Sequence, residues 1–324
     1  MARPLSLQKP PRLELGDVIG LCCPASAPPD PLAIDRAIAA LETLGFRPRP
    51  ASHLRQRQGF LAGSDRDRAD DLMRLLTDRE VKAVFCVRGG YGATRLLERL
   101  DFPAIRQRPT ILLGYSDITA LHCALARQAG LVSFHGPMLN SELSRPEVPA
   151  FTTQSLWRVL MKAEPAGSIS HGLTPEQTSA KTIRPGVAEG RLVGGNLSVL
   201  CALIGTPWMP DLKSRILFLE DLEEAPYRVD RMLTHLLSAG LLQKVAGIAV
   251  GVMRNCLDPK RAEFTEFRQT VDDVLIERLR PLGKPVVSGL PFGHVALNAT
   301  LPVGVHARLD GIKCDLVICE TAVR

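Results

Sequence analysis

Ser116 occupies a position in this sequence where a side chain can do chemistry. It directly follows the apolar run ILLGY (111–115) and precedes DITALHCALARQ (117–128), whose apolar spacing predicts a helix. In open α/β sheets, functional side chains gather at the carboxyl ends of strands, where loops meet helix N-termini. A serine in this place also suits a helix N-cap, because its hydroxyl accepts a backbone N–H bond. The local pattern therefore leaves two interpretations open, a helix cap and a nucleophile.

The residues around Ser116 do not form the nucleophile elbow G-x-S-x-G. Gly114 stands two residues before the serine, but Ile118 stands two residues after it. An α/β-hydrolase is therefore not indicated, and another serine-peptidase architecture stays open.

A glycine-rich loop follows the predicted strand VKAVFCV. Gly89, Gly90 and Gly92 in VRGGYGATRLL free backbone N–H groups to point into a crevice. Neither G-x-x-x-x-G-K-[ST] nor a full G-x-G-x-x-G is present, so a plain turn explains the loop as well as a phosphate or oxyanion cradle does. If Ser116 attacks a carbonyl, the amides of Gly90 and Asp117 are candidates to hold the developing oxyanion.

A serine nucleophile needs a base, and two of the seven histidines have a suitable position. His135 in SFHGPM and His294 in SGLPFGHVALN both lie in Gly/Pro loops just after apolar strands. His122 lies inside the predicted helix after Ser116, where nearness in sequence does not make it face the hydroxyl. The pattern alone does not separate His135 from His294.

The acid that orients such a base should be partly buried and fixed. Glu220 ends the apolar run ILFL, so its carboxylate is expected at the rim of the crevice. Asp221, Glu223 and Glu224 follow, and for these a solvated acidic turn is predicted. A structural role for Glu220 is an equal alternative at this point.

The elements that must position these residues alternate between strands and helices in the first half of the chain. Strands are predicted at DVIGLCCPAS, VKAVFCV and ILLGY, and helices at PPDPLAIDRAIAALETLGF, GSDRDRADDLMRLLTD and ATRLLERL. Ser64 and Asp67 stand at capping-box spacing at the start of one of these helices. Such a βαβ series gives a largely parallel sheet flanked by helices.

A polar segment without periodicity separates this half from the rest and is expected to connect two domains. The expected division is an N-terminal α/β domain at 1–165, a linker at 166–186 and a C-terminal α/β domain with a mixed sheet at 187–324. Further strands are predicted at GRLVG, ILFLE, GIAVGV, PVVSGL, ATLPVGVHARLD and KCDLVICE, and helices at NLSVLCALIG, YRVDRMLTHLLSAG and near FRQTVDDVLIERLR (267–280). A length of 324 residues agrees with two modest domains.

The composition argues against several function classes. Hydrophobic residues make up 45% and charged residues 23%, as in a globular protein. Basic residues usually sit near acids despite the formal charge of +6, and aromatics are only 5%, so no nucleic-acid partner is expected. The eight cysteines include no CxxC pair, which indicates reduced thiols and neither a disulfide framework nor a zinc site. No apolar run reaches about 18 residues and no apolar h-region begins the chain, so we expect a cytoplasmic enzyme without a membrane partner.

Taken together, the motifs resemble the cytoplasmic L,D-carboxypeptidases, serine peptidases that include muramoyltetrapeptide carboxypeptidase and the microcin-immunity peptidases. The matching motifs run in family order from about residue 17 to 310 and are FLAGSDRDRADDL, VKAVFCVRGGYGATRLL, GYSDITALHCAL, FHGPM, GRLVGGNLSVL, LFLEDLEEAPYRVDRML and GLPFGHVALNATLPVGV. Seven motifs in the same order are far more specific than any one of them.

The resemblance implies roles residue by residue. The serine of GYSD, the glutamate closing FLE and the histidine of FGH match the family's nucleophile, acid and base, which implies Ser116, Glu220 and His294. It likewise implies an oxyanion hole from the backbone of Gly90 and Asp117. The implied reaction is acyl transfer that releases terminal D-alanine from a small murein tetrapeptide in peptidoglycan recycling, with no metal or organic cofactor. The family fold places the active site between the two domains, and its members are commonly homodimers.

Residues that bind the substrate are harder to assign. Arg88 and Arg191 both adjoin glycine motifs, and each can pair with the terminal carboxylate or serve in a structural ion pair. Gly89 belongs to the glycine loop, and Asn196 in GGNLS can be a helix cap or a site residue.

Two other functions stay open. A microcin-immunity type peptidase shares the triad but cleaves a peptidyl-nucleotide conjugate, and its site should offer aromatic surfaces on which the base stacks. Trp208 in GTPWMPD is the only tryptophan near a plausible site loop, although a core or interface position explains it better. A non-catalytic glycine-loop binding protein would keep its function when Ser116 is replaced by alanine.

Overall fold

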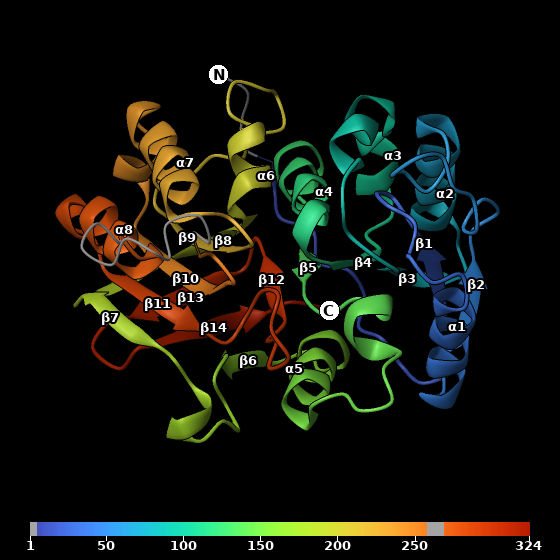
Figure 1. Ribbon diagram of the computed structural model, residues 1–324. Coiled ribbons are helices and arrows are strands. Elements are labelled where there is room, and N and C mark those ends of the chain that lie inside the picture. Colours follow the sequence, from blue (N-terminus) through green and yellow to red (C-terminus); the bar gives the residue numbers. More distant parts are fainter. Residues whose placement is uncertain (1–4, 258–268) are drawn as a thin grey trace.

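The computed structural model describes residues 5–257 and 269–324, which form two sheets side by side (Figure 1). The first sheet has six strands in the order β12-β5-β4-β3-β1-β2. Five of them are parallel, namely β1 (Val18–Cys22), β2 (Arg47–Pro50), β3 (Val81–Cys86), β4 (Ile111–Gly114) and β5 (Ser133–His135). The sixth, β12 (Leu301–Val303), comes from the far end of the chain and pairs antiparallel with β5.

The second sheet has eight strands in the order β6-β14-β13-β8-β9-β10-β11-β7. Its parallel centre consists of β8 (Val187–Asn196), β9 (Arg215–Leu222), β10 (Gly247–Arg254) and β11 (Val286–Leu290). Antiparallel strands flank this centre, namely β6 (Pro165–Ser168), β7 (Lys181–Arg184), β13 (His306–Asp310) and β14 (Asp315–Thr321). The predicted fold class, an α/β protein with one largely parallel and one mixed sheet, is confirmed.

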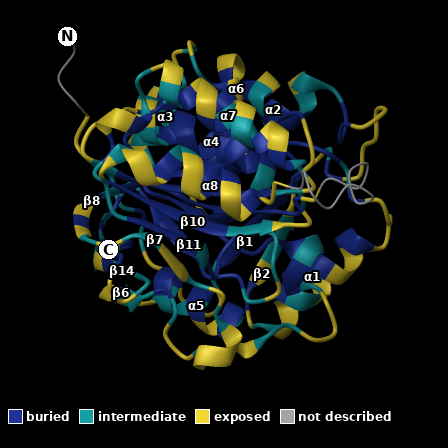
Figure 2. Ribbon diagram, turned by 60° about the vertical axis from the view of Figure 1, so that its left-hand side comes forward, coloured by how far each residue is buried: buried dark blue, intermediate teal, exposed yellow. Residues whose placement is uncertain are grey.

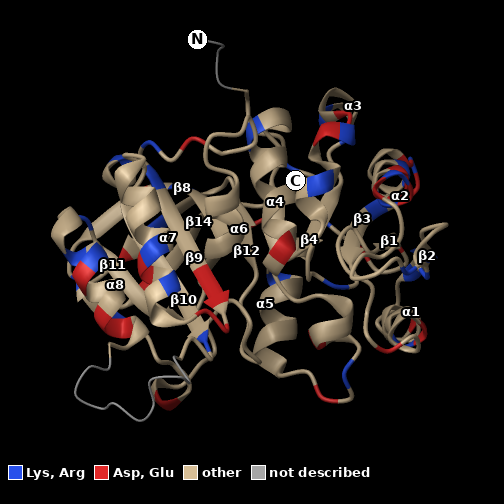
Figure 3. Cartoon of the chain, turned by 45° about the horizontal axis from the view of Figure 1, so that its top comes forward, with Lys and Arg blue, Asp and Glu red and all other residues tan. Residues whose placement is uncertain are grey.

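Helices cover both faces of the two sheets, and their exposed sides face outward (Figure 2). They are α1 (Ala33–Thr43), α2 (Asp65–Thr77), α3 (Phe102–Gln107), α4 (Thr119–Ala124), α5 (Ala150–Met161), α6 (Leu197–Ala202), α7 (Pro226–Ser238) and α8 (Val271–Leu279). Acidic and basic residues mix on outer helices such as α2 and α8 (Figure 3). Among the described residues, no helix has the length and apolar character needed to cross a bilayer.

Each face of the sheets has its own apolar core, and each core contains residues of both sheets. Leu112 of β4 and Leu217 of β9 belong to one core, whereas Leu113 and Phe218, their neighbours in sequence, belong to the other. This follows from the alternation of side chains along a strand and explains why these strands are apolar throughout.

Capping signals in the sequence predicted the start of some helices correctly. Ser64 caps α2 as predicted, because its hydroxyl oxygen accepts a hydrogen bond from the Asp67 amide at 3.1 Å. The helix predicted at 28–46 begins later than its Asp-Pro signal indicates, at Ala33, and the Asp30 carboxylate accepts from the Leu32 amide instead. The predicted helix at 267–280 is α8, and residues 267 and 268 of that prediction lie outside the described residues.

Three elements differ from the sequence-based expectations. The segment ATRLLERL forms a 3-10 helix, Ala93–Arg99, instead of an α-helix. The edge strand β2 was not predicted, because its sequence RPRP carries two prolines and no apolar alternation. The single strand predicted at ATLPVGVHARLD is wrong, since the chain turns at Gly304 and contributes β12 to the first sheet and β13 to the second.

Candidate active site

Ser116 lies at the carboxyl end of β4, where the chain makes a 3-10 turn, Ser116–Ile118, before α4. The N-cap positions of this turn and of α4 are Tyr115 and Ile118, so the cap interpretation of Ser116 is not realised. Its backbone instead has a left-handed conformation with φ of 63°. Such a conformation is uncommon and costly for a non-glycine residue; this protein also has it in turns, at Ser214 and Glu223, and elsewhere it recurs at active sites.

Glu220 and His294 form a hydrogen-bonded pair on the second sheet. His294 Nδ1 donates to Glu220 Oε2 at 2.6 Å, and the carboxylate is fully buried. Because Nδ1 carries the proton in this bond, Nε2 is left to accept one. Gly293 has φ of 106°, and a Cβ there would lie 2.9 Å from Glu220. The glycine before His294 is therefore needed for the imidazole to approach the acid.

Tyr115 connects Ser116 to this pair. Its ring packs edge-on against the imidazole of His294, with centroids 4.7 Å apart. Its hydroxyl donates to Glu142 Oε1 at 2.7 Å, and Glu142 Oε2 accepts from the Met138 amide at 2.9 Å. The ring and the hydroxyl of Tyr115 are thus both held by contacts. Through Tyr115, the turn that carries Ser116 on the first sheet packs against His294 of the second sheet.

The glycine loop lies directly against the Ser116 hydroxyl. A Cβ on Gly89 would lie 3.2 Å from Ser116 Oγ. Ser26 holds the loop, because its amide donates to Gly89 O and its hydroxyl accepts from the Tyr91 amide, both at 3.1 Å. Gly90 has φ of 103°, and its amide makes no hydrogen bond with another described residue. That amide is therefore available to a ligand near Ser116.

The Asp117 side chain fastens the serine turn to the end of the same loop. Its Oδ2 accepts from the Ala93 amide at 2.7 Å. Burial raises the pKa of this carboxyl to about 6. The side chain is thus committed to the loop, and only the backbone of Asp117 is left for chemistry at Ser116.

Asn196 and Asp221 form a second buried pair beside Glu220. Asn196 is the register partner of Glu220 across β8 and β9, and it caps α6 by accepting from the Val199 amide at 3.2 Å. Its Nδ2 donates to Asp221 Oδ1 at 2.8 Å. The prediction of a solvated position for Asp221 is wrong, because β9 continues past Glu220 to Leu222; burial raises the Asp221 pKa to about 6.

The two arginines that adjoin glycine motifs lie apart. Arg88 precedes Gly89 and donates to Ala27 O at 2.6 Å, which leaves other guanidinium donors beside the glycine loop. Arg191 lies five positions before Asn196 on β8, toward the opposite end of the strand, and donates to Gly304 O at 2.8 Å. Arg88 is thus near the site and Arg191 is not.

Two aromatic residues at the rim were missed by the sequence-based reasoning. Tyr91 is 50% exposed, follows Gly90, and packs edge-on against Phe60, which is 65% exposed. Their separation by some 30 residues gives no sequence signal of contact. Trp208 is partly buried and instead packs on Phe102 of the core, and Gln128 donates to the carbonyl oxygen of the neighbouring Pro207.

His122 and His135 belong to the core. His122 Nε2 donates to Gly114 O and its Nδ1 accepts from the Ser133 hydroxyl, both at 2.8 Å, so the ring is neutral. Burial lowers the pKa of His122 to about 4 and that of His135 well below its ordinary value. Neither ring nitrogen of His135 has a polar partner among the described residues. Of the two base candidates, only His294 is paired with an acid.

The contribution of His122 to the stability of the protein is expected to fall in mild acid. The folded-state pKa of about 4 lies below the ordinary value of 6.5, so the unfolded chain takes up the proton first as the pH falls. The stability that the neutral ring contributes is present above pH 6.5 and is lost toward pH 4. Between pH 7 and pH 5 this loss amounts to about 2 kcal/mol of unfolding free energy, measurable by denaturant titration at both pH values.

The control for this prediction is His122→Gln, which removes the titrating group and keeps an amide at its place. Its unfolding free energy should fall by about 2 kcal/mol less than that of the wild type over the same interval. His135, whose lowered pKa acts in the same sense, and Asp117 and Asp221, whose raised pKa values act in the opposite sense, are present in both proteins and cancel in the comparison. An equal pH dependence of the two proteins would contradict a neutral, buried His122.

Within the described ranges, no three His, Cys, Asp or Glu side chains are grouped so that they could hold a metal ion. What the arrangement offers is a strained serine, an acid–imidazole pair and an unpaired backbone amide.

Comparison with known proteins points to one family. The model of the LD-carboxypeptidase N-terminal domain matches residues 19–136, and that of the LD-carboxypeptidase C-terminal domain matches residues 189–309. A probable murein peptide carboxypeptidase of Bacillus subtilis is 39% identical over 310 residues, which cover 96% of this chain and 94% of the relative.

Two solved structures share the fold and part of the sequence. The crystal structure of muramoyltetrapeptide carboxypeptidase from Oxalobacter formigenes has a TM-score of 0.81 and 34% identity, covering 93% of this chain and 97% of that one. The microcin C7 self-immunity protein MccF, in complex with aspartyl sulfamoyl adenosine, has a TM-score of 0.87 and 25% identity, covering 98% and 100%.

Proposed function

Because the chain belongs to the LD-carboxypeptidase family and is a carboxypeptidase, we propose that it removes the terminal D-alanine from murein tetrapeptides with a Ser116–His294–Glu220 triad. The observation that carries the triad is the hydrogen bond from His294 Nδ1 to the buried Glu220, next to a serine held in a left-handed conformation. A murein peptide as the substrate is supported by the names of the similar proteins, which are murein peptide and muramoyltetrapeptide carboxypeptidases.

In the proposed mechanism, His294 Nε2 takes the Ser116 proton while Ser116 Oγ attacks the carbonyl carbon on the L-configured side of the terminal peptide bond. Glu220 keeps the proton on Nδ1 and stabilises the imidazolium that forms. The amides of Gly90 and Asp117 hold the oxyanion of the tetrahedral intermediate. His294 then gives its proton to the leaving D-alanine amine, and the acyl group remains on Ser116. Water, activated by the same imidazole, hydrolyses this ester.

Substrate binding is proposed to involve the first residues of the glycine loop. Arg88 has guanidinium donors beyond the one used by Ala27 O, and it directly precedes Gly89, so it is placed to pair with the terminal carboxylate. Asn196 has a supporting role, because its side chain donates a hydrogen bond to Asp221, the residue after Glu220. No part of this proposal requires a metal or an organic cofactor.

The proposal includes the setting of the reaction. We assign the nucleophile to an N-terminal unit at 1–165 and the acid and base to a C-terminal unit at 187–324, joined through 166–186. The substrate is a small peptide of peptidoglycan recycling, which places the enzyme in the cytoplasm, and family resemblance supports a homodimer.

A second candidate substrate is a peptidyl-nucleotide conjugate of the microcin type. The exposed pair of Phe60 and Tyr91 beside the glycine loop favours it, because nucleobases stack on aromatic faces. Trp208 does not contribute to such a surface, since it packs against Phe102. A single aromatic pair is weaker support than the similarity to proteins named as murein peptide and muramoyltetrapeptide carboxypeptidases. The murein peptide therefore remains the first candidate substrate.

The substrate assignment is tested by comparing kcat/KM for a murein tetrapeptide ending in D-alanine with that for aspartyl sulfamoyl adenosine. We expect the tetrapeptide to be preferred by about ten-fold or more, a difference of about 1.4 kcal/mol in transition-state binding. The matched control is the same tetrapeptide ending in L-alanine, which should not be cleaved. A higher kcat/KM for the adenosine conjugate would replace the first candidate with the second.

A further inference from the structure

A pocket of about 410 Å³ lies at the ends of β8 and β9 that are remote from the candidate active site. Arg191 and Arg215 are register partners at this end, and Asn196 and Glu220 are register partners five positions further along the same strands. At about 3.3 Å per residue, these two register pairs are about 16 Å apart along the strands. The volume is in the range of small-molecule sites, and none of the proposed reaction takes place there.

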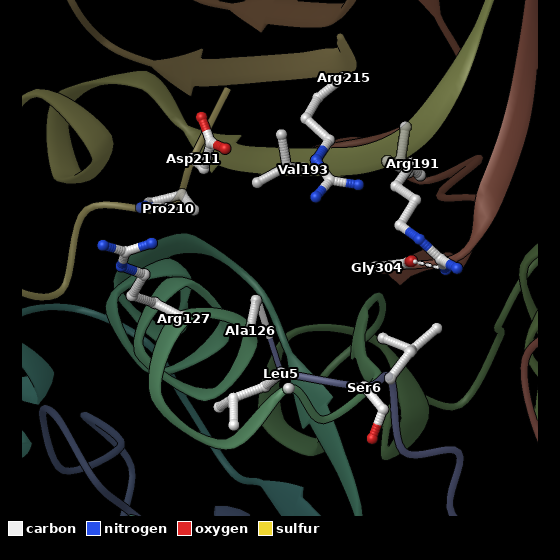
Figure 4. Close-up of a pocket in the computed structure, with 13 residues that line it drawn as sticks. Leu5, Ser6, Ala126, Arg127, Arg191, Val193, Pro210, Asp211, Arg215 and Gly304 are labelled. Atoms are coloured by element: carbon white, nitrogen blue, oxygen red, sulfur yellow. Dashed lines mark hydrogen bonds between the residues drawn. The ribbon is translucent and has the colours of Figure 1, made fainter. Parts of the chain in front are cut away.

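The pocket has two walls from different parts of the chain (Figure 4). One wall consists of β8 and the start of β9, and the other of the segment after α4 together with the N-terminal residues Leu5 and Ser6. Arg106 holds the N-terminal segment in place, because it donates to Ser6 O at 2.9 Å and to Ser6 Oγ at 2.8 Å. The Gln8 amide donates to Gly130 O at 2.7 Å. Both walls are therefore preformed.

The charged groups that line this pocket are mostly positive. Among the described lining residues, Arg127, Arg191 and Arg215 contribute three positive charges and Asp211 one negative charge, which leaves a surplus of two. In Figure 4 the guanidinium of Arg215 extends from its strand into the open space, and Arg127, on the opposite wall, has its guanidinium on the side of Pro210 and Asp211. Apolar side chains, among them Leu5 and Val193, line the remainder.

Arg215 is the residue that most needs a partner. Arg191 donates to Gly304 O and pairs with Glu320 at 3.3 Å, but the Arg215 side chain has no ion pair or hydrogen bond with another described residue. It is half-buried; burial and the charge of Arg191 lower its pKa, and the charge of Asp211 acts in the opposite direction more weakly. Charges removed from water are normally paired, so a half-buried guanidinium without an ion pair or hydrogen bond to a described residue indicates an anion that binds there.

We propose that this pocket binds a small phosphate monoester with an apolar body. A phosphate monoester carries about −1.5 to −2 charges at neutral pH, which matches the surplus of two, and guanidinium groups bind its oxygens in bidentate fashion. The pocket is larger than a single phosphate group fills, and its apolar wall fits the rest of such a molecule. This site is separate from Ser116 and independent of the function proposed for it.

Calorimetric titration with phenyl phosphate at low ionic strength tests the proposal. Wild-type protein should show one saturable site with a Kd below about 1 mM. Arg215→Gln should raise this Kd about ten-fold or more, because it removes a charge-assisted hydrogen-bond donor. Inorganic phosphate should bind more weakly than phenyl phosphate, since it leaves the apolar wall uncovered. Phenol, which lacks the charge, should give no saturable binding.

The matched control is Arg66→Gln, which removes an exposed arginine on α2 that does not line the pocket and should leave the Kd unchanged. The thermal midpoint of Arg215→Gln should equal or exceed that of the wild type, because an unpaired half-buried charge is lost. Absence of saturable binding to the wild type, or an unchanged Kd in Arg215→Gln, would overturn the proposal. Succinate that binds as tightly as phenyl phosphate would overturn its preference for phosphate.

Discussion

Ser116→Ala should lower kcat for D-alanine release from the murein tetrapeptide by about 10⁴-fold or more, with the protein still folded. The substitution removes the only atom that can form the acyl-enzyme in the proposed mechanism, and the oxyanion hole alone is left to assist water. Alanine keeps the small side chain that a left-handed backbone with φ of 63° tolerates, so the turn before α4 should persist. Free D-alanine is quantified in single-turnover and steady-state reactions of the purified proteins.

The control for this prediction is Ser214→Ala. Ser214 is also a serine with a left-handed backbone, with φ of 56°, but it precedes β9 at the end remote from Glu220. Ser214→Ala should have the wild-type kcat. Its thermal midpoint should change by the same amount as that of Ser116→Ala. If Ser116→Ala retains more than about one hundredth of the wild-type kcat, the serine is not the nucleophile, whereas the family assignment would stand.

Glu220→Gln is the second variant for which we expect a large effect, a loss of about 10³- to 10⁴-fold in kcat. Glutamine has the same shape, but its amide nitrogen can donate to His294 Nδ1, and this favours the tautomer with the proton on Nε2. In that tautomer the imidazole cannot accept the Ser116 proton. The hydrogen bond of 2.6 Å from Nδ1 to Oε2 is the contact that the substitution reverses. The effect should fall on kcat with little change in KM, because Glu220 does not touch the substrate in the proposed mechanism.

Glu223→Gln provides the matched control on the same segment. Glu223 lies three residues after Glu220, is exposed, and has φ of 56° in the turn after β9. Its substitution should leave kcat and KM within about two-fold of the wild type. If both glutamate variants lose activity equally, the cause is the fold of the turn and not the tautomer of His294.

Much of the fold could be predicted because its strands are buried on both faces. Apolar runs such as ILLGY and ILFLE mark β4 and β9 directly, and Ser64 and Asp67 mark the start of α2. Residue patterns cannot show which distant segments become neighbours. The edge strand RPRP carries no apolar signal, and the break at Gly304 is a single glycine inside an otherwise continuous strand pattern.

In the candidate site, too, local sequence signals predict some residues, whereas others depend on tertiary contacts. Ser116 and Glu220 could be proposed locally, because each follows an apolar run. His135 and His294 have equivalent local patterns, and only the family motif separated them before the structure did. The difference between them arises from tertiary structure, since β12 and Phe218 enclose His135 while Gly293 brings His294 to Glu220. The contact of Phe60 with Tyr91 likewise depends on packing alone.

The pairing of β12 with β5 has a consequence for the order in which this enzyme is made. The sheet that carries Ser116 is closed by Leu301–Val303, and helix α5 is bonded to the same late segment through Thr152 and Ser155, which contact Ala296, Asn298 and Thr300. Until the ribosome has produced Leu301–Val303, the sheet that carries Ser116 has an open edge beside β5. If the proposed triad is correct, Ser116 therefore gains its catalytic partners only after residues 294–303 have been made and the sheet has closed.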